Sequence, residues 1–524
     1  MSPRQIFGLW LMALVPLMIA VDGAPVQRTQ EARVLETARQ MLGRGAHAWL
    51  IPSVNGETRL RKPPLAYWMA AASFEIFGVS ENAGRLPTIL MSWLLVGATY
   101  AIAARLFDQI TGLFAAAALL SSFLFFRFGR LAETDLPASF FATVAADLFW
   151  RALDTESAGL FHAAAAVTGL SFFAKQGPGF FPLLFFVTMA IVRRKPRAIG
   201  KFILSGAPIT LLVVAGWWYA YAVFDQGIAQ FKHELAEVAE GIDHPATFLI
   251  YFPWIMLQAA PWSLLIVGAV IAAIKRVKTD ARLLGLCIWA ASDLVPLCFL
   301  GNKQEHYLFP LMPPLMILTG WLIRRALAPD EDPKLKRAVS ILMGISIIAT
   351  VVASACAALG VAAMESRINR PAVYVPAFIA AASVWTWHVL KKRGLAGAAI
   401  TFAVVWSFAF PVLLDTYGAR YSTDDIRVTA AKIQQRFGEG PYLFYGPDSS
   451  LPLCFAMRRE INHIRDGQPD DLIAAATQTP RVFVIWHLTS QEPVLPAQFA
   501  PVAPDFGHAG QTFRIYQLRP FNPP

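Results

Sequence analysis

Thirteen apolar segments, separated by polar turns, fill most of the first 415 residues of the chain. A helix needs about 20 residues to cross ~30 Å of hydrocarbon, and these segments come close to that length. Only 15% of the residues are charged and 56% are hydrophobic, whereas a soluble domain has roughly 25% charged residues. The chain is therefore predicted to be a polytopic α-helical membrane protein with about 13 transmembrane helices. The segments are 5–21, 87–104, 108–126, 136–153, 158–174, 178–192, 202–224, 257–274, 283–300, 308–323, 338–363, 372–390 and 395–414.

Basic residues are unevenly distributed between the two sets of turns. The clusters Arg193-Arg194-Lys195 and Lys391-Lys392-Arg393 fall in turns on the same side of the membrane. Cytoplasmic turns carry an excess of Lys and Arg, so we place these turns and the N-terminus inside. Residues 22–86 and 416–524 then lie outside, in the periplasm of a bacterial inner membrane. This bias accounts for the formal charge of +10 without a nucleic-acid partner.

Residues 416–524 are predicted to form a small soluble α/β domain beyond the transmembrane domain of residues 1–415. Hydropathy falls after residue 414, and segments with strand and helix patterns then alternate. The expected strands are 441–445, 481–486 and 512–518, and the expected helices are 424–437 and 470–477.

The loop 22–86 is the longest polar segment between two predicted spans. It has a helical pattern over 30–42, and Asn55-Gly56 is a turn signal. Lys62 precedes two prolines, which fix the backbone next to its positive charge. Loops of this length with structure of their own are usually functional, so we expect this loop to form the floor of an active site.

Several motifs of this loop and of later turns occur together in one known family. In the loop they are Asn55-Gly56, Lys62-Pro63-Pro64-Leu65-x-Tyr67-Trp68, Phe77-Gly78, Glu81 and Arg85-Leu86-Pro87; later in the chain they are Asp135-Leu136-Pro137, Lys175 with Gly177-Pro178, Pro261-Trp262 and Lys303-x-x-x-Tyr307. The chain resembles the protein O-mannosyltransferase superfamily, especially the bacterial branch that includes the lipid A aminoarabinose transferases. The likeness extends over about residues 5–330.

This resemblance implies a GT-C fold and a membrane glycosyltransferase. The enzyme would move a hexosyl or pentosyl unit from a polyprenyl-phosphate donor to an envelope acceptor on the periplasmic face. The acceptor would be lipid A, another glycan or a protein, in lipopolysaccharide or protein glycosylation. Direct attack by the acceptor would invert the anomeric centre.

A lipid-phosphate donor requires positive charge where the departing phosphate becomes anionic. The candidates for binding this phosphate are Arg33, Arg61, Lys62, Lys175, Lys303 and the hydroxyl of Tyr307. Lys303 and Tyr307 are one helical turn apart and would share a face. The alternative for Lys62 is anchoring to lipid headgroups.

The acceptor hydroxyl requires a general base, usually a carboxylate in such a site. Glu31 is the first candidate, followed by Asp22 and Asp135. Glu31 and Arg33 are also explained as the polar face of an interfacial helix. Asp135 in Asp-Leu-Pro is also explained as a helix cap, with proline in the first turn.

The chain departs from the family at two positions. Gln30 stands where the family has the aspartate linked to catalysis, and Arg61 replaces the acidic residue implicated in metal binding by the aminoarabinose enzymes. Arginine has no lone pair to offer a metal, which argues against a metal at this position. A divalent metal bound by His233, Glu234 and His244 is a further possibility, with ordinary solvated side chains as the alternative.

Two other functions fit the same segments. Gln30 and Arg61 are compatible with a family member whose chemistry is altered or lost. A lipid-linked-sugar transporter, or a binding component of an envelope complex, would place charged residues near the membrane midplane. Asp293 is the clearest charged residue within a predicted span, while most polar residues lie at outer helix ends. This distribution favours the enzyme.

Overall fold

The structure is a computed structural model that divides the chain into two compact units. The helical unit comprises residues 1–21, 61–66 and 85–416, and the mixed unit comprises residues 22–60, 67–84 and 417–524. The described residues are 1–19, 21, 25–26, 28–240, 248–364, 370–421, 425–438, 441–445, 449–464, 469–477, 483–488, 499–501, 506–508 and 511–518.

All thirteen predicted apolar segments belong to the helical unit, and helices occupy them in the described residues. Four of them, 5–21, 108–126, 202–224 and 257–274, are each interrupted by a turn and divided between two helices. Its helices are α1 (Pro3–Met12), α2 (Leu14–Met18), most of α6 (Glu81–Leu106), α7 (Gln109–Leu120), α8 (Phe123–Phe128), α9 (Asp135–Thr155), α10 (Ala158–Ala174), α11 (Gln176–Val192), α12 (Pro196–Leu204), α13 (Ala207–Glu240), η1 (Phe248–Ile250), α14 (Tyr251–Gln258), α15 (Ser263–Ile274), α16 (Ala281–Phe299), η2 (Glu305–Leu311), α17 (Met312–Ala326), α18 (Pro333–Met364) and most of α19 (Arg370–Tyr421).

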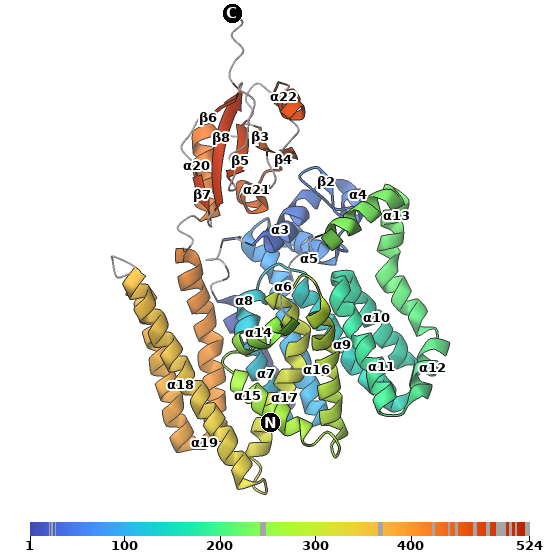
Figure 1. The fold of residues 1–524 in the computed structure, drawn as a ribbon, viewed down its shortest axis with the longest axis vertical. Helices are drawn as coiled ribbons and strands as arrows, with labels where there is room; N and C mark the ends of the chain where they lie inside the picture. Colours follow the sequence, from blue (N-terminus) through green and yellow to red (C-terminus); the bar gives the residue numbers. More distant parts are fainter. Residues whose placement is uncertain are drawn as a thin grey trace, which may run out of the picture. The chain divides into compact units, whose positions relative to one another are not determined.

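The protein is a multi-pass membrane protein. Among the described residues, six helices are long and apolar enough to cross a bilayer, or seven if α14 and α15, bent by 118°, form one broken span. Helices α10 and α11 are apolar but have only 17 residues each. The long helix α19 is broken at Gly394, where φ is 72°, and Figure 1 draws its two halves side by side. These halves correspond to the predicted segments 372–390 and 395–414.

Helices of this unit approach closely where small residues meet. Helix α10 packs against α9 and α13, and α17 packs against α7 (Figure 1). At the α7–α17 contact, a Cβ on Gly320 would lie 2.6 Å from the carbonyl oxygen of Thr111 and 2.7 Å from the amide nitrogen of Ala115. Small interface residues let helix backbones meet in membranes, so Gly320 sets the distance between these two helices.

We expect Gly320→Ala to lower the thermal unfolding midpoint of the full-length protein in nanodiscs. The added methyl group would meet backbone atoms that cannot rotate away, and overpacking of this kind costs about 1–3 kcal/mol. The matched control is Gly216→Ala in α13, where an added Cβ meets no atom within 4 Å. Equal midpoints for the two variants would contradict the prediction.

The mixed unit begins with the elements of the first polar loop. They are α3 (Thr29–Met41), α4 (Gly45–Leu50), β1 (Ser53–Val54), β2 (Glu57–Thr58) and α5 (Leu65–Phe77), whose first two residues belong to the helical unit. Strands β1 and β2 are antiparallel. Asn55 and Gly56 join them with φ of 54° and 83°, as two-residue hairpin turns require. The predicted helix and turn are confirmed.

The C-terminal part of the mixed unit contains a sheet with the strand order β4-β3-β5-β8-β6, in which β7 also pairs with β8. Its strands are β3 (Tyr442–Tyr445), β4 (Asn462–Ile464), β5 (Phe483–Leu488), β6 (Phe499–Pro501), β7 (Phe506–His508) and β8 (Gln511–Leu518), and its helices are α20 (Ile426–Phe437), α21 (Leu451–Met457) and α22 (Pro469–Thr477). Strand β3 is parallel to β4 and β5, and β8 is antiparallel to β5. The three predicted strands and two predicted helices are present, while β4, β6, β7 and α21 were not predicted.

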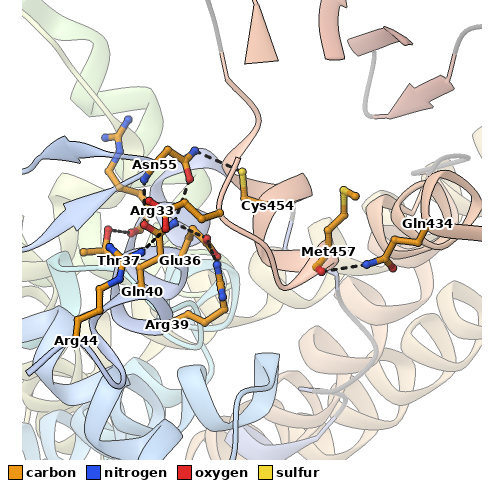
Figure 2. Close-up of polar contacts among 11 residues, drawn as sticks. Arg33, Glu36, Thr37, Arg39, Gln40, Arg44, Asn55, Gln434, Cys454 and Met457 are labelled. Carbon is orange, nitrogen blue, oxygen red and sulfur yellow. Dashed lines mark hydrogen bonds and ion pairs between the residues drawn. The ribbon is translucent and has the colours of Figure 1, made fainter. Parts of the chain in front are cut away.

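A chain of hydrogen bonds joins the first loop to the C-terminal segment inside the mixed unit (Figure 2). Arg39 binds Glu36 through two nitrogens, at 2.8 and 2.6 Å. Gln40 Nε2 donates to Glu36 at 2.7 Å and to Asn55 at 3.0 Å. Asn55 Nδ2 in turn donates to Cys454 Sγ on α21 at 3.5 Å. Residues 22–60 therefore share one compact unit with residues 417–524, and the domain boundary at residue 415 stays a prediction.

We expect Glu36→Gln to change the pH dependence of stability. Burial raises the pKa of Glu36 above its usual value of 4.5, although Arg39 and Gln40 oppose this shift. The folded state therefore binds a proton more tightly than the unfolded state, and this contribution to stability falls as the pH rises from 4.5 through the raised pKa.

The thermal unfolding midpoints of wild type and Glu36→Gln, measured between pH 4.5 and 7.5, test this expectation. The advantage of wild type should shrink toward pH 7.5. An advantage that grows with pH would show that folding lowers the pKa of Glu36, and a constant advantage would show that folding leaves this pKa unchanged.

Candidate functional site

Polar side chains from four separate parts of the helical unit meet at the ends of its helices. Asp135 is the first residue of α9, and Lys175 lies in the break between α10 and α11. The φ of −162° at Lys175 is extended, so the chain leaves one helix there before it enters the next. Tyr307 lies in η2, and Lys62 precedes α5.

A buried ion pair forms the centre of this cluster. Lys175 Nζ lies 2.5 Å from Asp135 Oδ1, and the two side chains are 14% and 6% exposed. The same ammonium group lies 4.1 Å from the centre of the Tyr307 ring. Thr134 is the N-cap of α9 and makes no side-chain capping bond. Asp135 thus begins the helix as predicted, but its carboxylate binds Lys175.

Neighbouring charges keep both members of the pair ionised. Burial by itself would raise the pKa of Asp135, but Lys175, His306 and Lys62 outweigh it and the net pKa is lowered. Burial by itself would lower the pKa of Lys175, but the Asp135 carboxylate outweighs it and the net pKa is raised. The site therefore presents an ammonium group and a carboxylate side by side at neutral pH.

The Lys-Pro-Pro motif lies next to this pair. Lys62 Nζ donates to Thr134 Oγ1 at 3.3 Å, directly before Asp135. The carbonyl oxygen of Arg61 accepts a bond of 3.0 Å from Gln176 Nε2, directly after Lys175. The structure therefore brings together four of the residues predicted for the site: Lys62, Asp135, Lys175 and Tyr307.

Lys303 and its neighbour Glu305 make other contacts. Lys303 Nζ donates to the carbonyl oxygen of Leu300 at 2.6 Å. Glu305 forms an ion pair with Arg127 and accepts a bond of 2.7 Å from Gln258 Nε2. A role of Lys303 in phosphate binding stays a prediction.

The remaining predicted residues belong to other parts of the chain. Glu31 and Arg33 lie on α3 of the mixed unit. Glu31 is only 1% exposed, unlike a residue on the solvated face of an interfacial helix. Asp22, His244 and the side chains of His233 and Glu234 lie outside the described residues. Roles for these residues stay predictions.

Two residues of the cluster were not assigned a role from the sequence. Glu133, Asp135 and His306 each offer one ligand atom, and these atoms lie within 4.8 Å of one another. All three residues are buried, and His306 Nε2 lies 3.7 Å from Asp135 Oδ2. The Glu-x-Asp spacing and the position of His306 next to Tyr307 were the available signals. This group, unlike Arg61, has the lone pairs that a metal requires.

Comparisons with known proteins show which proteins this chain resembles. Residues 61–219, which include Lys62, Asp135 and Lys175, match the family model of dolichyl-phosphate-mannose-protein mannosyltransferase. An undecaprenyl phosphate-alpha-4-amino-4-deoxy-L-arabinose arabinosyl transferase of Sodalis glossinidius is 25% identical over 433 residues, 74% of this chain and 75% of that protein.

Two further relatives match over a smaller share of their length. The arabinosyl transferase of the same description from Photorhabdus laumondii is 25% identical over 59% of this chain and 58% of its own. An uncharacterized protein of Aquifex aeolicus is also 25% identical, over 59% of this chain and 63% of its own. The chain thus spans less than two thirds of both proteins.

Solved structures establish the fold. The crystal structure of ArnT from Cupriavidus metallidurans bound to undecaprenyl phosphate has a TM-score of 0.77 and 18% identity, covering 98% of both chains. The archaeal oligosaccharyltransferase AglB from Archaeoglobus fulgidus has a TM-score of 0.50 and 11% identity, covering 93% of this chain and 70% of its own. The chain has the GT-C fold and resembles the aminoarabinose transferases, as predicted.

We expect the Asp135–Lys175 pair to behave as a buried unit. Removing one partner leaves an uncompensated buried charge, which costs about 3–5 kcal/mol. Asp135→Asn and Lys175→Met should each lower the free energy of unfolding. The double variant should lower it by less than the sum of the two single effects. Unfolding by sodium dodecyl sulfate in mixed micelles measures these free energies.

The control is the pair Lys201–Glu156, whose side chains are 54% and 30% exposed. Lys201→Met should leave the free energy of unfolding nearly unchanged, because solvent already screens this pair. Strictly additive effects at Asp135 and Lys175 would mean that the two charges do not stabilise each other.

Proposed function

We propose that this protein is an integral-membrane glycosyltransferase that moves a sugar from a polyprenyl-phosphate donor to an envelope acceptor. The main support is the cluster of Lys62, Asp135, Lys175 and Tyr307 in the helical unit. The likeness to proteins described as undecaprenyl phosphate aminoarabinose arabinosyl transferases supports the same donor class. So does the fold shared with a structure that contains undecaprenyl phosphate.

Lys62 and Lys175 would bind the donor phosphate. Fixed positive charges in a water-poor site stabilise an anion as it forms, without the cost of reorganising solvent. Tyr307 lies beneath the Lys175 ammonium group, where its hydroxyl can donate to a phosphate oxygen. Arg33, Arg61 and Lys303 are further candidates for the same role.

A carboxylate would accept the proton of the acceptor. Asp135 already accepts a charged hydrogen bond from Lys175, which reduces its capacity as a base. Glu31, buried on α3, therefore remains the first candidate, with Asp22 and Asp135 behind it. Direct attack would invert the anomeric centre. The donor sugar would be a hexose or a pentose, and lipid A, another glycan or a protein would accept it.

The proposed topology follows the predicted one. About 13 helices would cross the membrane, including the shorter apolar ones such as α10 and α11. The first loop and the C-terminal α/β domain, residues 416–524, would face the periplasm. The positive-inside bias of the turns supports this orientation.

A catalytically altered protein is the second candidate, and Gln30 favours it. Glutamine carries no negative charge where related enzymes have an aspartate linked to catalysis. Such a protein would bind the lipid phosphate without transferring a sugar.

We expect Lys62→Met to weaken binding of undecaprenyl phosphate to the full chain in phosphatidylcholine nanodiscs by about tenfold or more, because hydrogen bonds to charged groups contribute about 1.5–3 kcal/mol. The control is Lys336→Met, at the start of α18, which removes the same positive charge far along the chain from Lys62. This variant should bind the lipid as wild type does. Unaltered binding by both Lys62→Met and Lys175→Met would refute the phosphate site.

Mass spectrometry of envelope glycans then tests turnover. Cells that carry wild type should contain a glycan modification that Lys62→Met and Glu31→Gln abolish, although both variants are present and folded in the membrane. If wild type binds the lipid phosphate but no glycan modification is found, the result would support the catalytically altered protein.

A further inference from the structure

Two carboxylates and an imidazole occupy one buried position beside the proposed phosphate site. The amide of Glu133 donates to the carbonyl oxygen of Leu131 at 2.7 Å, so the chain turns sharply just before α9. This turn brings Glu133 close to Asp135, the first residue of α9. The ring of His306 reaches the same position from η2 and lies against Phe128, with ring centres 5.5 Å apart.

We propose that Glu133, Asp135 and His306 bind one divalent transition-metal ion. Asp135 would use Oδ2, which lies 3.7 Å from His306 Nε2, while Oδ1 stays bound to Lys175. Lys175 would then orient a metal ligand from outside the coordination sphere, an arrangement typical of ligating carboxylates. The site differs from the one that the family resemblance implies, where Arg61 replaces the acidic ligand.

The distances suit this role. Metal–ligand bonds of about 2.0–2.2 Å place the ligand atoms of a tetrahedral site about 3.4 Å apart. The ligand atoms of Glu133, Asp135 and His306 lie within 4.8 Å of one another, so small side-chain rotations would close them around an ion. Three protein ligands leave at least one position open, as in catalytic metal sites.

The ligand types restrict the ion. Two carboxylates and one imidazole suit Mn²⁺ or Zn²⁺, whereas Ca²⁺ and Mg²⁺ prefer oxygen ligands alone. The set contains no thiolate, which would favour Cu⁺ or an iron–sulfur cluster.

Charge balance connects the metal with the donor, and this step rests on the proposed function. In the protein alone, Lys175 is paired with Asp135, and Lys62 binds the neighbouring Thr134. A lipid phosphate would bring a further negative charge next to these two buried carboxylates. A divalent ion would offset that charge and would accept a phosphate oxygen in its open position. Metal and lipid phosphate should therefore strengthen each other's binding by the same factor.

Electron paramagnetic resonance of Mn²⁺ tests the site in the full chain, in phosphatidylcholine nanodiscs that add no anionic lipid. We expect one bound Mn²⁺ per chain, with a ¹⁴N coupling from an imidazole. Glu133→Gln and His306→Phe should each weaken binding by about tenfold or more, as loss of a ligand or of its support does. The matched control is Glu305→Gln, which removes a carboxylate next to His306 that binds Arg127 and Gln258 instead.

Several results would overturn the proposal. They are the absence of stoichiometric Mn²⁺ and Zn²⁺ binding, a bound Mn²⁺ without ¹⁴N coupling, or equal affinities for wild type and both ligand variants. The ¹⁴N coupling is measured on wild type, so it tests imidazole ligation of the metal even if the variants fail to fold. The proposed function is tested separately by measuring undecaprenyl phosphate binding in buffer with EDTA, which removes divalent metal ions. If this binding still depends on Lys62, the phosphate site is supported even when the metal proposal is wrong.

Discussion

The buried ion pair between Asp135 and Lys175 holds the rest of the candidate site in place. Two charges removed from water need each other, because a buried charge without a partner is strongly unfavourable. Their contact at 2.5 Å fixes the start of α9 against the break between α10 and α11. Lys62, Tyr307 and His306 then pack around a pair whose geometry is already set. An anion that enters the site meets an ammonium group whose position is predetermined.

Much of the helical unit could be predicted from the sequence, because the membrane restricts the chain to a few solutions. Each apolar segment must satisfy its backbone hydrogen bonds internally, and helices occupy all the predicted segments, four of which are interrupted by a turn. The number of spans was harder to predict, because α14 and α15 meet at a bend of 118° and because α10 and α11 are short. Hydropathy measures length and composition, and it does not register a bend.

The site could be predicted less completely. Lys62, Lys175 and Tyr307 stand in motifs that the sequence analysis singled out. Glu133 and His306 had only weak signals, the Glu-x-Asp spacing and the position next to Tyr307, because the turn before α9 and the entry of η2 bring them together. The strands β4, β6 and β7 were missed for a related reason. Each has only three residues, too few for a pattern, and pairing with longer neighbours creates them.

The order of the site's elements along the chain has a consequence for biosynthesis. Asp135 and Lys175 leave the ribosome close together and can pair as soon as α9, α10 and α11 are inserted. His306 and Tyr307 follow only after the described helices α12, α13, η1, α14, α15 and α16 have been made. A nascent chain can thus neutralise its central charges before the residues around them have been made.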